Sequence, residues 1–313
     1  MGQPPASIEG LVKPLLARIR PRAKSLIVSI YGDAILPHGG SVWLGSLIRA
    51  AEPLGLSERM VRTAVFRLAK DGVLVATQSG RRSYYALTEP GRHQFESAQN
   101  RIYAPPERTW DGTWVLAIAS SSVPRKKREV LRRELGWLGF ALLGPTVLAC
   151  AGGERVAAER VIRKLGLADS VVLMRAEAEG PGALTQLRGL IAEAWPIDHV
   201  GKTYEDFLEI FGDIRLTVDD SGAIDPELSF LLRVLLIHEY RRALLRDPGL
   251  PRDLLPPNWP GLASANLARD LYRLLAGPAE RHVMARFETL DGELPAANAS
   301  FQTRFGGLAR YLL

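Results

Sequence analysis

The feature that most constrains this chain is residues 57–87, where a helical pattern is followed by two β-rich runs. Ser57 is a good helix cap, because its hydroxyl can accept a hydrogen bond from a first-turn amide that has no helical partner. Apolar residues recur at helical spacing from Val61 to Leu68 and predict one buried face. Asp71-Gly72 ends this pattern. The first part of the stretch therefore predicts an amphipathic helix.

A second face of the same helix is basic. Arg59, Arg62 and Thr63 share it by helical spacing, with the apolar Phe66 at the next position of the same spacing. Arginine on such a helix can read guanine edges and phosphates in the major groove of DNA. We therefore predict contacts to bases or phosphates from these three residues. Arg67 and Lys70 are expected to meet mainly the DNA backbone.

The two β-rich runs, Val73–Val75 and Tyr84–Leu87, are joined by a basic loop at Ser79–Ser83. This order is typical of a β-hairpin. Arg81 and Arg82 are expected at its tip, in contact with phosphate or the minor groove. A helix followed by a basic hairpin is the winged helix-turn-helix pattern. The alternative is an ordinary α/β segment with a solvated charged face.

The residues before this stretch favour the DNA-binding interpretation. Apolar runs at Leu26–Tyr31 and Val42–Ile48 predict two further helices, and Leu54–Leu56 is a short turn that contains glycine. Two helices joined by such a turn are the helix-turn-helix unit. We therefore predict that residues 1–104 form a winged helix-turn-helix domain.

The distribution of charge supports a polyanionic partner for this domain. The chain has a net charge of +6. Residues 1–104 carry 14 Lys and Arg against 7 Asp and Glu, whereas the remaining residues carry 26 against 27. The excess positive charge is thus confined to the first third, which points to double-stranded DNA. A scaffold that only docks proteins has no need of this excess positive charge.

The compartment is predicted from what the sequence lacks. The single cysteine, Cys150, permits no internal disulfide and fits a reducing environment. We find neither a signal-peptide pattern at the start nor an apolar run of the roughly 20 residues that cross a membrane. We expect a cytoplasmic protein without membrane contact, in which Cys150 is an inert core thiol.

Residues 105–182 alternate between strand and helix patterns and predict a ferredoxin-like βαββαβ domain. The expected elements are strands at 114–119, 138–142, 146–150 and 171–175, and helices at 124–135 and 154–165. The basic residues of the first of these helices are expected to face water.

Residues 183–313 read as a helical domain, so the overall fold class is α+β. Its expected helices are 184–195, 204–211, 227–245, 264–276 and 279–289. A proline-rich loop, Asp247–Gly261, interrupts them and holds Trp259. So many prolines forbid a regular helix and favour one fixed loop shape. Trp259 is interpreted as a structural plug between helices, with the wall of a pocket as the alternative.

Several motifs together resemble a known family. They are Tyr31-Gly32-Asp33, Trp43–Ile48, Arg62–Val65, Gly80–Leu87, Arg101-Ile102-Tyr103, His238–Arg242 and Trp259-Pro260-Gly261. The chain resembles the PaaX-type repressors of phenylacetic acid degradation over nearly its whole length. The resemblance implies a three-part, dimeric transcriptional repressor of an aromatic-acid catabolic operon. It also implies release from DNA by an aryl-CoA thioester such as phenylacetyl-CoA.

The effector site is expected in the helical domain. His238, Arg241 and Arg242 share one helix face, which could bind the phosphates of a CoA group by charge-assisted hydrogen bonds. Trp259 would then cover the acyl part. The alternative is that the two arginines pair with neighbouring acids such as Glu239 and lock the loop.

An enzyme is not expected. The strand that ends at Ala119 runs into Ser120–Ser122 without an acid to hold a metal for phosphodiester cleavage. We find no nucleophile elbow, phosphate-binding loop or zinc spacing. The pair Asp219-Asp220 is interpreted as a solvated loop. We therefore expect no catalytic residue, metal or cofactor. The competing function is an acyl-CoA-binding or protein-interaction scaffold without sequence-specific DNA binding.

Overall fold

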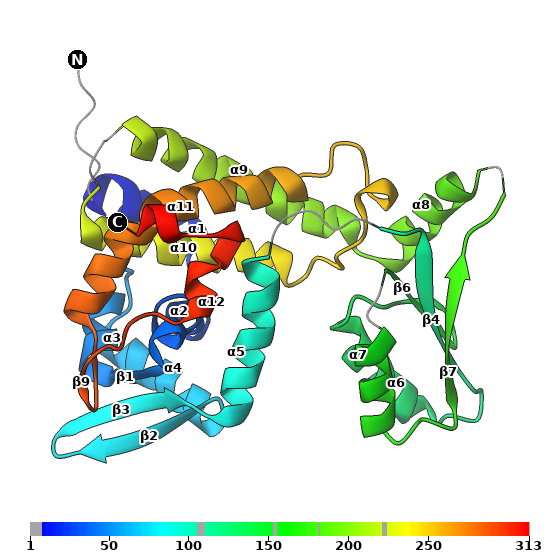
Figure 1. Ribbon diagram of the computed structural model, residues 1–313, viewed down its shortest axis with the longest axis horizontal. Helices are drawn as coiled ribbons and strands as arrows, with labels where there is room; N and C mark the ends of the chain where they lie inside the picture. The colour runs from blue at the N-terminus through cyan, green and yellow to red at the C-terminus, as the bar shows by residue number, and fades with distance from the viewer. Residues whose placement is uncertain (1–7, 105–109, 153–154, 181, 221–223, 313) are drawn as a thin grey trace. The chain divides into compact units, whose positions relative to one another are not determined.

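A computed structural model describes residues 8–104, 110–152, 155–180, 182–220 and 224–312 (Figure 1). The side chains of residues 8, 9, 219 and 220 lie outside this description, and so does the expectation for Asp219-Asp220. The fold is α+β, with helices and small antiparallel sheets. Two compact units form. The first contains residues 1–106, 204–245 and 261–313, and the second contains residues 107–203 and 246–260. The expected three-domain division stays a prediction.

The first unit begins with two helical segments, η1 and α1, that were not predicted, and the helices and hairpin expected from the sequence follow them. Ser57 caps α4, as its Oγ accepts a hydrogen bond from the Met60 amide at 3.4 Å. Thr88 caps α5 in the same way through the Gly91 amide, at 3.1 Å. These elements are η1 (Ile8–Val12), α1 (Lys13–Ile19), α2 (Ala23–Ile30), α3 (Leu44–Ala51), α4 (Glu58–Lys70), β2 (Leu74–Ser79), β3 (Arg82–Leu87) and α5 (Glu89–Ile102).

The expectation that a helix begins at Val42 is wrong. Residues Ser41–Trp43 form a short strand, β1, and α3 begins only at Leu44. β1 pairs with β3, where Trp43 lies opposite Tyr84. An apolar run of this length fits either element by pattern, and here the pairing partner decides the outcome. The resulting sheet has the strand order β1-β3-β2.

Long helices complete the first unit. The expected pair of helices at 264–276 and 279–289 is wrong, because α11 (Gly261–Arg286) continues through Pro278. Proline removes one helical hydrogen bond, but α11 packs along α10 and the helix continues (Figure 1). The further elements are α9 (Ile197–Asp220), which extends into this unit from the second, α10 (Pro226–Leu244), β8 (Glu288–Thr289), β9 (Gly292–Glu293) and α12 (Ala299–Gln302).

A buried charged cluster joins the N-terminal elements of this unit to the long helices. Asp33, which is 1% exposed, accepts hydrogen bonds from Arg233 Nε at 2.8 Å and Arg304 Nη1 at 3.2 Å. Two tyrosine hydroxyls, of Tyr103 and Tyr272, also donate to it, at 2.8 and 2.9 Å. Buried charges are tolerated when they are paired and hydrogen-bonded. Asp33 therefore serves as the common acceptor of four segments of the chain.

The second unit is built on the expected βαββαβ order. Its sheet is antiparallel with the strand order β5-β6-β4-β7, so the coarse ferredoxin-like expectation is confirmed. The β5 strand lies later than expected because a turn follows α6. The elements are β4 (Thr113–Ala119), α6 (Arg125–Gly136), β5 (Ala141–Gly144), β6 (Val147–Ala151), α7 (Arg155–Lys164), β7 (Val171–Glu177) and α8 (Ala183–Ala194).

Apolar side chains cover both faces of this sheet. Residues of α6 and α7, such as Leu131 and Ile162, pack on one face, where Cys150 is buried as expected. Trp195 and Leu254 belong to the cluster on the other face, with the partly buried Trp259 packed against it. The Trp259 ring also lies against Gly201. This placement agrees with the interpretation of Trp259 as a structural plug.

Candidate nucleic-acid interface

Helix α4 separates its buried and exposed residues as the sequence predicts. Val61, Ala64, Val65 and Leu68 are buried against the rest of the first unit. The predicted contact residues Arg59, Arg62, Thr63, Arg67 and Lys70 are all exposed. The helix therefore offers a basic face to the solvent.

The polar groups on this face are held only by weak local contacts. Arg62 pairs with Glu58 one turn away, at 2.7 Å. The hydroxyl of Thr63 donates to the backbone oxygen of Arg59 at 2.8 Å. Because exposed ion pairs contribute about 0–1 kcal/mol, Arg62 is readily available to an external anion.

The basic face continues onto α2, which the sequence reasoning missed. A cavity of about 250 Å³ lies between the start of α2 and α4, and Lys24, Arg59, Thr63 and Arg67 help to line it. Lys24 also forms an ion pair with Asp71 at the end of α4. Lys24 is distant from α4 in sequence, so only the folded arrangement reveals that it belongs to the same surface.

Two large apolar side chains add to this surface. Phe66 is 67% exposed, and Met60 is 41% exposed. Burial in the core therefore does not account for either. Apolar side chains on a helix in the major groove can contact the methyl group of thymine. Phe66 follows the helical spacing of the basic face, and its exposure agrees with its place on that face.

The hairpin positions its two arginines differently. β2 and β3 are joined by a two-residue turn at Gly80-Arg81, in which Gly80 adopts the left-handed backbone at φ 56°. Arg81 is exposed at this turn. Arg82 lies at the start of β3, where it pairs with Glu288 at 2.8 Å and stacks on Trp43 at 4.2 Å. Arg82 directly follows the turn and is exposed, and its side chain contacts Trp43 and Glu288 beside the sheet. Its contact with DNA stays a prediction.

The expected effector residues on α10 have partners inside the first unit. His238 Nδ1 lies 2.9 Å from Ser29 Oγ, and burial, followed by the charges of Arg241 and Arg242, lowers the pKa of His238 to about 3. Its imidazole is thus neutral at pH 7. Arg241 donates to Ser29 Oγ at 2.9 Å and to two oxygens of Ser25 at 2.8 and 2.9 Å.

The remaining two residues expected to bind the effector, Arg242 and Trp259, also have partners within the fold. Arg242 pairs with Glu239 at 2.7 Å, as the alternative interpretation of this segment expected. Trp259 belongs to the second unit and packs there against an apolar cluster. The four residues are thus divided between two compact units. Their role in effector binding stays a prediction.

Comparisons with known proteins cover most of the chain. Residues 22–91 match the family described as PaaX-like protein, residues 107–187 the PaaX protein central Cas2-like domain, and residues 195–285 the PaaX-like protein C-terminal domain. The Transcriptional repressor PaaX of Escherichia coli (strain K12) is 37% identical over 91% of this chain and 90% of its own length. The chain belongs to the PaaX family.

The comparisons also include a solved structure. An uncharacterized protein, Rv0674 from Mycobacterium tuberculosis, aligns with 76% of this chain and 90% of its own, at 22% identity and a TM-score of 0.46. The family membership confirms the prediction of a regulatory protein of the PaaX type rather than an enzyme. Among the residues that the structure describes, no helix has the length and apolar character needed to cross a bilayer.

Proposed function

We propose that this chain is a DNA-binding transcriptional repressor whose first unit works as a winged helix-turn-helix. Helix α4 would enter the major groove and the β2-β3 hairpin would act as the wing. The observation that carries this proposal is the exposed basic face of α4, with Arg59, Arg62 and Thr63 above a fully buried apolar face. The relative from E. coli bears the name of a transcriptional repressor, which supports the same function.

The neighbouring groups divide into two kinds of contact. Arg59, Arg62, Thr63 and the exposed Phe66 are placed to meet base edges. Lys24, Arg67 and Lys70 on α2 and α4, and Arg81 at the hairpin turn, would meet phosphates, which position a protein on DNA without reading its sequence. Arg82 would contribute to the positive electrostatic potential of the hairpin while its side chain stays beside Trp43 and Glu288.

We further propose that the repressor binds DNA as a homodimer. A single helix with a wing makes few base contacts, and two-fold symmetry supplies a second half-site at a fixed spacing. Light scattering of the free protein and of its complex with DNA tests this point. We expect a dimer in both, and a monomer at micromolar concentration with no dimer on DNA would contradict it.

The third part of the proposal is release by an aryl-CoA thioester such as phenylacetyl-CoA. An effector shifts an equilibrium only by its difference in affinity for the two states. Phenylacetyl-CoA must therefore bind better to a state that holds DNA poorly. The resemblance to the family supports this choice of effector.

Nuclease protection of the intergenic DNA beside the gene tests the function directly. We expect a protected site that is lost on addition of phenylacetyl-CoA and kept with free phenylacetate. A salt titration on the protected site and on random duplex separates the alternatives. Tight, specific binding indicates a repressor, whereas equal weak binding to both DNAs indicates a scaffold without sequence-specific recognition.

A further inference from the structure

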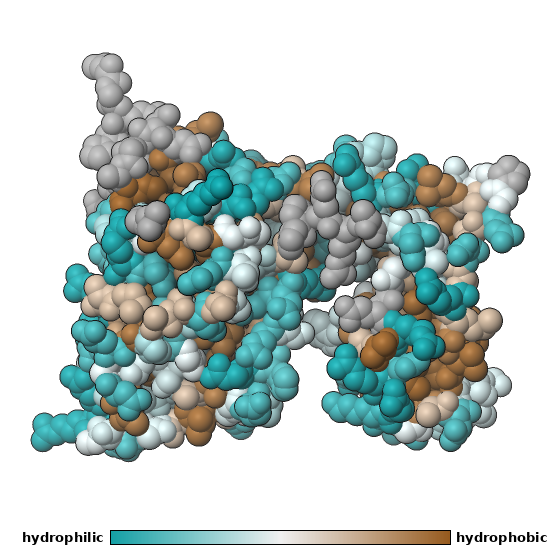
Figure 2. All heavy atoms as spheres, viewed as in Figure 1, coloured by the Kyte–Doolittle hydropathy of each residue, from teal (hydrophilic) through white to brown (hydrophobic). Residues whose placement is uncertain are grey.

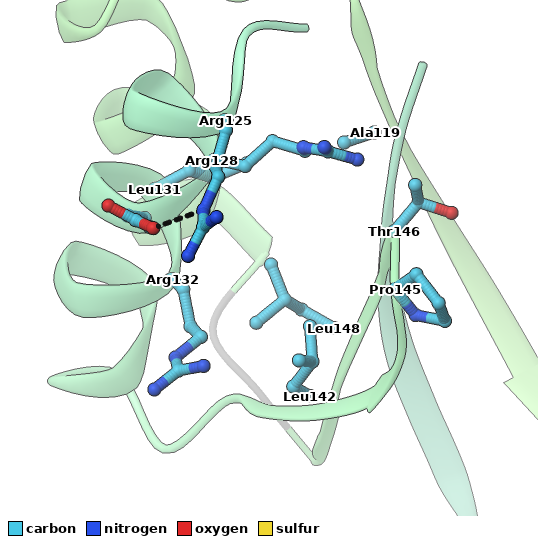
Figure 3. Close-up of a pocket in the computed structure, with 10 residues that line it drawn as sticks. Ala119, Arg125, Arg128, Leu131, Arg132, Leu142, Pro145, Thr146 and Leu148 are labelled. Carbon is cyan, nitrogen blue, oxygen red and sulfur yellow. Dashed lines mark hydrogen bonds and ion pairs between the residues drawn. The ribbon is translucent and has the colours of Figure 1, made fainter. Parts of the chain in front are cut away.

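The second unit contains an arginine-lined pocket that the proposed DNA contacts do not use. The pocket lies between α6 and the hairpin of β5 and β6 and has a volume of about 300 Å³ (Figure 3). Its walls combine basic and apolar groups. The side chains that matter most are Arg125, Arg128, Arg132, Leu142, Pro145 and Leu148.

The three arginines form one stripe along α6. Their spacing of three and then four residues places them on the same helix face. Arg125 pairs with Glu129 at 3.0 Å. Among the described residues, the guanidinium groups of Arg128 and Arg132 have no hydrogen-bond or ion-pair partner. In Figure 3 the Arg128 side chain extends across the top of the pocket towards Ala119, with Leu148 and Leu142 below it.

The surroundings of these unpaired cations are strongly basic. Helix α6 has six Lys or Arg residues against two Glu, and α7, which packs beside it, has four against one. Figure 2 shows mainly hydrophilic side chains over these two helices. Like charges at this density repel one another. An anion in the pocket would relieve that repulsion.

The chemistry of the walls indicates which anion fits. Guanidinium groups bind phosphate oxygens through two parallel hydrogen bonds, with planar geometry. The leucines and Pro145 offer an apolar floor of the kind that packs against a ring or an acyl chain. A ligand that uses both walls carries at least one phosphate and an apolar part.

We propose that this pocket binds an organic phosphate, with its phosphoryl groups on Arg128 and Arg132 and its apolar part over Leu142 and Leu148. The choice of a CoA compound as that organic phosphate rests on the proposed function. A CoA thioester carries a diphosphate next to an adenosine, whose ring could pack on the leucines, whereas its acyl group lies at the far end of the pantetheine arm and would extend out of the pocket. The pocket would then be the site at which the effector enters the repressor.

The shape of the site favours this small ligand over DNA. A DNA backbone binds to broad convex or grooved surfaces through many charges, so the outward-facing Lys126 and Lys127 would contribute as much as the pocket arginines. Arg128 and Arg132 instead line a concave space, whose volume is at the small end of the range for ligand pockets. The test below includes the DNA outcome.

Calorimetric titration of the full-length protein with phenylacetyl-CoA, free CoA and inorganic pyrophosphate tests the pocket. The variants are Arg128→Gln and Arg132→Gln, singly and together. Arg160→Gln is the matched control, because it removes one exposed positive charge from the neighbouring α7. We expect the double variant to lose about tenfold or more in affinity for phenylacetyl-CoA, and the control to lose about twofold or less.

Circular dichroism and thermal melting confirm that each variant is folded, and operator binding without ligand is measured in parallel. We expect that binding to stay unchanged in the double variant. The pocket proposal is overturned if the wild type binds none of the three ligands, or if the double variant and the control lose affinity equally. The proposal would also be overturned if the double variant kept its ligand affinity but bound random duplex more weakly, because the two arginines would then contact DNA. If the wild type binds CoA compounds but no operator, the proposed function is refuted, whereas the proposal that the pocket binds an organic phosphate is supported.

Discussion

Arginine has opposite roles in the two units of this protein. Around Asp33 in the first unit, Arg233 and Arg304 are at most 2% exposed and share a buried carboxylate. On α6 in the second unit, Arg128 and Arg132 line an open pocket and have no anion among the described residues. The difference shows that burial and partners, rather than residue type, separate an arginine that holds the fold from one that is available to a ligand.

The exposed face of α4 stands between these extremes. Arg62 has a partner, Glu58, but both side chains are more than half exposed. Such a pair is weak in water and can exchange for a phosphate or a guanine edge. The comparison therefore predicts large effects on stability around Asp33, and effects confined to binding on α4 and at the hairpin tip.

The largest effect is expected from Asp33→Asn. The substitution leaves Arg233 and Arg304 buried without their shared negative charge, which costs about 3–5 kcal/mol in the free energy of unfolding. Urea unfolding measures this loss. The control is Asp71→Asn, which removes the exposed ion pair with Lys24 and should cost about 1 kcal/mol or less. Similar losses for the two variants would show that the buried cluster around Asp33 stabilises the fold no more than the exposed pair does.

The next largest effect is expected from Arg62→Ala. On the operator it should cost about 1–3 kcal/mol of binding free energy and relax the base preference at one position of each half-site. The unfolding midpoint should stay unchanged, because Arg62 is exposed. Binding measurements on the operator and on random duplex check this. Equal losses on the two DNAs would show that Arg62 contacts the backbone.

A smaller effect concerns pH and His238. The pKa of His238 is about 3 in the folded protein and about 6.5 when unfolded. Between these values the unfolded state binds more protons, so stability falls as the pH falls, by up to about 1.4 kcal/mol per pH unit. His238→Asn should flatten this dependence between pH 6.5 and pH 5 in urea unfolding. An unchanged slope would mean that His238 does not resist protonation in the fold.

The smallest effect is expected from Arg81→Ala at the hairpin turn. Arg81 is exposed and is expected to meet phosphate only. Its loss should weaken operator and random duplex alike and reduce the slope of log affinity against log salt by about one. Salt titrations on both DNAs measure it. Loss of discrimination between the two DNAs would instead assign Arg81 to base recognition.

Local patterns predicted the elements of this fold better than its contacts. Ser57 marked a helix start correctly, because capping depends only on neighbouring residues. Pro278 misled the prediction, because packing of α11 along α10 outweighs the loss of one hydrogen bond. The strand at Trp43 was missed because its partner lies about 40 residues away, at Tyr84.

The candidate site was predictable only where one helix carries it. The basic face of α4 follows from spacing, and its exposure agrees with the prediction. Lys24 was missed because α2 brings it to this surface from another part of the chain. Arg241 illustrates the reverse, because its helix face looked open in sequence and is occupied by Ser25 and Ser29 of α2. Contacts between distant segments are not encoded in a local pattern.

The cluster around Asp33 has a consequence for how the protein is made. The four side chains that bond to Asp33 follow it by 70, 200, 239 and 271 residues. During synthesis the N-terminal helices leave the ribosome long before these partners exist, and contacts of such long range form late. The buried carboxylate stays incompletely neutralised until Arg304 has been added. A truncated chain would thus lack a finished core in the unit that contains α4, so that only complete molecules present a stable basic face.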